Sequence, residues 1–186
     1  LAPIPHREEQ FRPPLAPSTP QRVIAPPKQQ YLIVDGYNMI FAWDELKALA
    51  KEDLDAARQR LMDTLANYAS YKQCRLVLVF DGYKVKGNRG TTFDYHSIQV
   101  VFTKENETGD MYIEKLIQEI GRNFAVRVAT SDGLIQLSAL RAGVLRVTAG
   151  ELLHEVEFVL EQMARAIEAW NKKGSAHPQQ DKRTKP

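Results

Sequence analysis

Five short runs of apolar residues occur between residues 31 and 147, and amphipathic segments separate most of them. The runs are continuous rather than alternating, which is typical of β-strands buried on both faces. The expected strands are 31–34, 76–80, 98–102, 126–129 and 144–147.

Between these runs, apolar residues recur every three or four positions, which is the spacing of one helical face. Helices are expected over 51–71, 108–120 and 134–142, and a last helix follows Thr148. Thr148 and Glu151 form a capping box there. The apolar face of that helix continues to Trp170, and we expect it to dock on the sheet rather than on a partner.

Strands that alternate with helices predict a three-layer α/β/α fold around a central parallel sheet. Right-handed crossovers bring the carboxyl ends of parallel strands to one edge of the sheet. Ligands of such folds bind at that edge, so candidate functional residues are sought there.

Composition separates the two ends of the chain from its middle. All ten prolines lie outside 31–170, and eight of them precede residue 28. Residues 1–30 are therefore expected to be a proline-rich disordered linker, and 171–186 a basic disordered tail. The folded domain is expected to span 31–170. The linker, and a first residue other than Met, suggest a domain linked to or excised from a larger upstream region.

The net charge of +2 hides an acidic middle, because residues 31–170 hold 16 basic and 20 acidic residues. Domains that bind nucleic acid are ordinarily basic, so such a function requires the acids to be concentrated in a metal site. The single cysteine, Cys74, excludes an intrachain disulfide, and the apolar runs are too short to span a membrane. We expect a cytoplasmic protein.

Four aspartates arrive at the expected ligand-binding edge. Asp35 follows the first strand, Asp81 the second and Asp132 the fourth, and Asp110 lies in the first turn of the helix after the third. Neighbouring carboxylates repel one another unless a cation lies among them, and oxygen ligands suit Mg²⁺ or Mn²⁺. We therefore expect all four to be catalytic residues and metal ligands.

Each aspartate also has a purely structural interpretation. Asp35 and Asp81 each precede glycine, as in ordinary turns. Asp132 can cap the following helix, and Asp110 can offset a helix dipole. The functional interpretation therefore depends on the set of four and not on any one of them.

Two further polar residues lie close to these aspartates in the sequence. Asn38, just past the first strand, is a candidate catalytic residue that could hold a phosphate oxygen, or it could simply cap a turn. Glu107 is a candidate metal ligand, or a solvated loop charge.

Candidate nucleic-acid-binding residues flank the same edge. Lys84, Lys86 and Arg89 lie in a loop without acids and could bind phosphates, unless they are ordinary solvated charges. Tyr37 lies two residues after Asp35 and could stack on an unpaired base, or pack in the core.

Four motifs resemble, in order and spacing, those of the YacP-like NYN domain family within the PIN-like ribonucleases. They are Asp35-Gly36-Tyr37-Asn38, Phe80-Asp81-Gly82, Glu107-Thr108-Gly109-Asp110 and Thr130-Ser131-Asp132. The family leads us to expect Ala where Gly109 stands.

The resemblance implies a PIN-like fold with strand order 3-2-1-4-5 and divalent-metal-dependent RNA cleavage. It implies that the four aspartates bind Mg²⁺ or Mn²⁺, with Asn38 and Glu107 in support. It also implies RNA as the substrate, single-stranded RNA or mRNA above all, and the ribosome of a bacterium as a possible partner.

Other functional classes remain as alternatives to the metal-dependent endoribonuclease that we expect. A catalytically silent RNA- or ribosome-binding module is one, although bare carboxylates would repel phosphate. A phospho-acceptor receiver domain is disfavoured because Asp35 has no acidic neighbour and Arg146 is the only base near the fifth strand. A dinucleotide site is disfavoured because no G-x-G-x-x-G follows the first strand.

Overall fold

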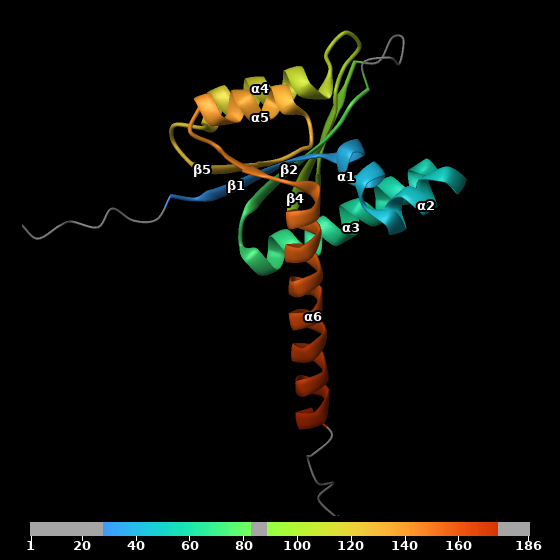
Figure 1. The fold of residues 1–186 in the computed structure, drawn as a ribbon. Coiled ribbons are helices and arrows are strands. Elements are labelled where there is room, and N and C mark those ends of the chain that lie inside the picture. Colours follow the sequence, from blue (N-terminus) through green and yellow to red (C-terminus); the bar gives the residue numbers. More distant parts are fainter. Residues whose placement is uncertain (1–27, 83–88, 175–186) are drawn as a thin grey trace, which may run out of the picture.

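A computed structural model describes residues 28–82 and 89–174. Residues 1–27 of the predicted linker and most of the predicted tail lie outside the described residues, as do Lys84 and Lys86. Residue 30, the last of the predicted linker, already belongs to the first strand. The chain forms a six-stranded sheet in the order β3-β4-β2-β1-β5-β6 (Figure 1). Its strands are β1 (Gln30–Asp35), β2 (Arg75–Phe80), β3 (Thr91–Tyr95), β4 (Ile98–Phe102), β5 (Ala125–Ala129) and β6 (Leu145–Val147).

Helices cover both faces of this sheet, which confirms the three-layer fold. They are α1 (Gly36–Ala42), α2 (Asp44–Glu52), α3 (Leu54–Lys72), α4 (Gly109–Ile120), α5 (Gly133–Arg141) and α6 (Ala149–Gly174). In β1, Leu32 and Val34 pack with α1, α2, α3 and α6, whereas Ile33 packs with α4 and α5. Successive residues of a strand face opposite sides, so a strand that is covered on both faces needs apolar residues at successive positions.

The five expected strands pair in the expected order 3-2-1-4-5, which corresponds to β4-β2-β1-β5-β6. The expectation of a wholly parallel sheet is wrong, because β3 adds an antiparallel edge strand beside β4. Most residues of β3 are exposed, so this strand lacks the continuous apolar run by which the others were recognised.

Two short helices were also missed. The expected helix at 51–71 begins instead at Leu54, because Asp53 ends α2 and caps α3 by accepting a hydrogen bond from the Ala56 N–H. The helix α1 begins directly at Gly36, where the Asp-Gly pair had suggested a turn.

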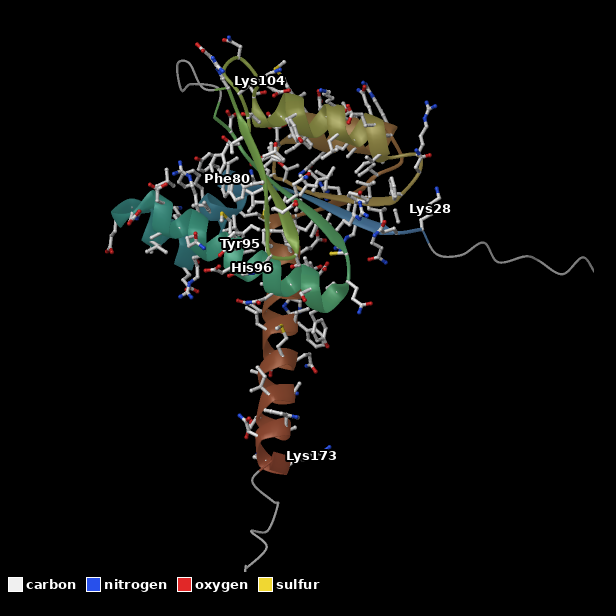
Figure 2. All side chains as sticks on the ribbon, turned by 180° about the vertical axis from the view of Figure 1, so that it is seen from behind. Lys28, Phe80, Tyr95, His96, Lys104 and Lys173 are labelled. Carbon is white, nitrogen blue, oxygen red and sulfur yellow. The ribbon has the colours of Figure 1, made fainter. Side chains whose placement is uncertain are left out.

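The last helix packs on α1 and α3 through its first half. The Trp43 indole Nε1 donates to the Ala149 carbonyl at 2.8 Å, and the Tyr68 hydroxyl donates to the Glu155 carboxylate at 2.7 Å. From residue 164 onward the described side chains are exposed, and the helix continues past residue 170, the expected domain end. Lys104, after β4, and Lys173, near the end of α6, lie at opposite ends of the molecule (Figure 2).

Within 28–82 and 89–174, no helix is long and apolar enough to cross a membrane.

Candidate active site at the carboxyl edge of the sheet

An open cleft of about 570 Å³ lies where β1 and β2 end and α1 and α4 begin. The parallel register brings the ends of β1, β2 and β5 to the same level, with Asp35 opposite Val79 and Val34 opposite Ala129. The residues that line the cleft are Asp35, Tyr37, Asn38, Phe41, Ala42, Asp81, Gly82, Gly109, Asp110 and Ser131. Three of the four predicted aspartates therefore share one cleft.

Asp35 is held from two sides. One carboxylate oxygen accepts the Asn38 N–H at 3.3 Å and so caps α1, and the other accepts the hydroxyl of buried Thr130 at 3.3 Å. Burial raises the pKa of Asp35 above its ordinary value, and the charges of Asp81 and Asp132 raise it further against these hydrogen bonds. The carboxylate is thus fixed in place where other negative charges act on it.

The side chain of Asn38 joins α1 to the segment after β5. Its Oδ1 accepts both the backbone N–H and the hydroxyl of Ser131, each at 2.9 Å. With Oδ1 in this role, the Nδ2 group remains as the hydrogen-bond donor of the side chain. Asn38 therefore lines the cleft in a defined orientation and does more than cap a turn.

Asp81 connects the end of β2 to the start of α4. Its carboxylate accepts the Gly109 N–H at 3.1 Å. A Cβ atom added at Gly109 would lie 3.5 Å from the Asp81 Cβ, an ordinary contact distance. The alanine expected at this position would therefore fit without displacing Asp81.

Asp110, in the first turn of α4, carries the largest electrostatic perturbation in the cleft. Its pKa is raised to about 6, first by burial and then by the charges of Asp132, Asp35 and Asp81, with a smaller effect of Glu114. The three other aspartates therefore lie close enough to oppose the ionisation of Asp110.

Asp132 has the capping role that the sequence allowed, and its charge also acts on the cleft. It caps α5, since its Oδ1 accepts the N–H groups of Leu134 at 2.7 Å and Ile135 at 3.2 Å. It is absent from the cleft lining, yet its charge raises the pKa of both Asp35 and Asp110.

The other predicted residues are placed less centrally. Glu107 is half-buried outside the cleft lining, where its charge raises the pKa of Tyr112. Arg89 is exposed. Tyr37 packs on the core, as one of its two interpretations expected, and it also lines the cleft.

The oxygen donors of the cleft fit a divalent cation in their chemistry. Within the described part of the chain, no group of three or more His, Cys, Asp or Glu side chains could hold a metal ion as it stands. The donors are nevertheless hard oxygens, which suit Mg²⁺ or Mn²⁺. The pKa values of Asp35 and Asp110 are raised by burial and by the charges of the neighbouring carboxylates, which indicates negative charge that a cation would relieve.

Three further residues shape the site. Thr130 and Ser131 hold Asp35 and Asn38, and their hydroxyls directly follow β5 in the motif that ends at Asp132. Phe41 lines the cleft from the last turn of α1. Phe41 was missed in the sequence because the helix that starts at Gly36 was not predicted. In that helix Phe41 lies one turn after Tyr37, on the same face.

The chain is similar to known proteins in sequence and in fold. Residues 32–185 match the model of the YacP-like NYN domain family. The chain is 44% identical over 138 residues to YacP of Bacillus subtilis (strain 168), described as an uncharacterized protein, and the match covers 73% of this chain and 80% of that protein.

Two solved structures are also similar. The crystal structure of Rae1 (YacP) from Bacillus subtilis matches with a TM-score of 0.67 and 40% identity, and covers 78% of this chain and 84% of that one. The crystal structure of a mutant of the same Bacillus subtilis protein matches with a TM-score of 0.67 and 39% identity, over 77% and 85% of the two chains.

Proposed function

The chain belongs to the YacP-like NYN domain family, and we propose that it is a divalent-metal-dependent endoribonuclease that hydrolyses RNA phosphodiesters in this cleft. The family makes the domain one of nuclease type. One observation carries the finer proposal: four aspartates from separate parts of the chain gather at one edge of the sheet, where neighbouring charges raise the pKa of Asp35 and of Asp110.

Asp35, Asp81, Asp110 and Asp132 would hold Mg²⁺ or Mn²⁺, with Glu107 as a more distant contributor. The bound cation would lower the pKa of a water molecule and neutralise charge on the phosphate. Capping bonds hold Asp35 and Asp132 in place, so their carboxylates keep their positions while substrate binds. The Nδ2 group of Asn38 would donate to a phosphate oxygen, because Ser131 occupies its Oδ1.

The substrate proposed is single-stranded RNA, and mRNA presented by the ribosome is the form that we favour. The acidic middle of the chain, with 16 basic against 20 acidic residues, predicts weak binding to free RNA. A partner that presents the RNA would offset this weakness, and Lys84, Lys86 and Arg89 would contribute phosphate contacts. A cytoplasmic location belongs to the same proposal.

The test is cleavage of a labelled single-stranded RNA with Mg²⁺, with Mn²⁺ and with EDTA. Wild type is compared with Asp35→Asn and Asp132→Asn, since asparagine is as good a helix cap as aspartate and so preserves the fold. Asp53→Asn is the matched control, because Asp53 caps α3 in the same way but is exposed outside the cleft.

Cleavage that requires metal, and that falls at least about 10–100-fold in both cleft variants but not in the control, is the expected result. If free RNA is not cut, the assay is repeated with translating ribosomes. A failure to cut there as well would refute the enzyme and leave the alternative, a catalytically silent RNA- or ribosome-binding module.

A further inference from the structure

One aromatic ring at the mouth of the cleft is exposed without an evident structural reason. In α1, Met39 and Ile40 are fully buried, whereas Phe41 is 55% exposed. Single exposed apolar residues are common and mean little alone. Phe41 differs because it lines the same cleft as Asp35 and Asp110.

The ring of Phe41 rests on a rigid support. It stacks on Tyr37, one helical turn earlier, with ring centroids 6.3 Å apart and an interplanar angle of 23°. Tyr37 packs edge-on against the Phe80 ring at 5.2 Å, and its hydroxyl accepts the Arg58 Nε–H at 2.9 Å. The Arg58 guanidinium also lies 5.2 Å from the centre of the Tyr37 ring.

These contacts change which ring is available for stacking. Tyr37 is half-buried, with Phe41, Phe80 and Arg58 around it. The exposed aromatic surface beside the aspartates therefore belongs to Phe41, and Tyr37 serves as its support.

The position of Phe41 relative to the aspartates suits a nucleotide. Asp35 caps the helix, and six residues of α-helix advance about 9 Å along the axis, a distance that one nucleotide can span. One wall of the cleft is thus acidic, and the adjoining wall is apolar and aromatic, formed by Tyr37, Phe41 and Ala42.

We propose that Phe41 forms a base-stacking subsite, on which an unpaired nucleobase next to the scissile phosphate lies. This inference rests on the proposed function and deepens it by selecting single-stranded RNA. Aromatic rings bind any base through its flat face, and the bases of a duplex are already stacked on each other. The acidic wall has no positive charge to attract RNA, and stacking supplies affinity that does not require such charge.

The test compares the full-length chain with Phe41→Ala, Phe41→Leu and Phe41→Trp. Phe158→Ala is the matched control, because Phe158 is 56% exposed on α6, outside the cleft lining. Because Phe41 is exposed, its truncation should leave the fold intact, which circular dichroism verifies. Binding is measured with Ca²⁺, an oxygen-liganded cation that would offset the negative charge of the cleft, and gel electrophoresis verifies that the RNA stays uncut. The ligands are short single-stranded RNAs with 2-aminopurine or an abasic nucleotide at each position in turn.

We expect Phe41→Ala to weaken binding by roughly 10–100-fold, the effect typical of losing one stacked base. Phe41→Leu should behave like Phe41→Ala, and Phe41→Trp should bind at least as well as wild type. Quenching of 2-aminopurine at one position should disappear with Phe41→Ala. An abasic nucleotide at that position should weaken RNA binding by wild type to the level seen for Phe41→Ala. It should not weaken RNA binding by Phe41→Ala any further.

Equal binding by wild type and Phe41→Ala would overturn the inference. Three other results would also overturn it: Phe41→Leu binds RNA as tightly as wild type, wild type binds duplex RNA as tightly as single-stranded RNA, or wild type binds no RNA. Metal-dependent cleavage with unchanged binding in all Phe41 variants would overturn the subsite and leave the nuclease. Phe41-dependent stacking without cleavage under any condition would overturn the nuclease and leave the subsite.

Discussion

Replacing Asp110 by asparagine should stabilise the protein in the absence of metal. Burial and the charges of Asp132, Asp35 and Asp81 raise the pKa of Asp110 from 3.8 to about 6. A shift of this size corresponds to at most about 3 kcal/mol of unfavourable free energy when the carboxyl is ionised. Because the side chain is largely solvated, screening leaves an expected gain of about 1 kcal/mol.

The sign of the pH dependence follows from the direction of the shift. The folded chain holds the Asp110 proton more tightly than the unfolded chain, so stability falls as the pH rises from 3.8 to about 6. The full cost is present above that range and absent below it. The advantage of Asp110→Asn should therefore be small near pH 3.8 and largest above pH 6.

The assay is urea unfolding in EDTA at both ends of this range, repeated with Mg²⁺ or Mn²⁺. Asp94→Asn is the control, since it removes the same charge from exposed strand β3, outside the cleft lining. Added metal should raise the unfolding midpoint of wild type more than that of Asp110→Asn. An Asp110→Asn variant that is no more stable than wild type above pH 6 in EDTA would refute the argument that repulsion acts on Asp110.

Three other substitutions test contacts of the fold, two of them next to the cleft. Gly109→Ala should raise the free energy of unfolding by about 0.5–1 kcal/mol and leave RNA cleavage intact, because the added Cβ meets Asp81 at 3.5 Å, an ordinary contact. Gly36→Ala should lower the melting temperature and cost about 1–3 kcal/mol, because its Cβ would lie only 2.4 Å from the Phe80 ring. Glu155→Gln should cost about 1–3 kcal/mol at neutral pH, because it weakens charged hydrogen bonds to a guanidinium and a phenol. Those partners lower the pKa of Glu155 below 4.5, so the carboxylate stabilises the fold above that pH and loses this effect as the pH falls. In urea unfolding, the difference in free energy of unfolding between wild type and Glu155→Gln should therefore shrink on acidification.

Buried strands were the part of the fold most readable from the sequence. A strand covered on both faces must be apolar at every position, so β1 and β2 appear as unbroken runs whatever packs on them. The strand β3 is exposed and carries no such mark, because its place depends on the hydrogen bonds that β4 offers at the edge of the sheet.

The arrival of four aspartates at one edge also followed from the sequence, because parallel strands with right-handed crossovers align their carboxyl ends. Which aspartate bears the largest charge effect did not follow. Asp110 has that role because the paired register of β1, β2 and β5 brings three other carboxylates toward the start of α4.

The sequence by itself determined the layered fold and the edge where its chemistry lies, since both depend on periodicity and chain order. Only the tertiary structure decided which side chains serve that edge. Thr130 is buried and donates a hydrogen bond to Asp35, whereas Phe41 is exposed in the same cleft as Asp35. Burial and exposure of single residues depend on neighbours distant in the chain, such as Phe80 beneath Tyr37, and local patterns do not record them.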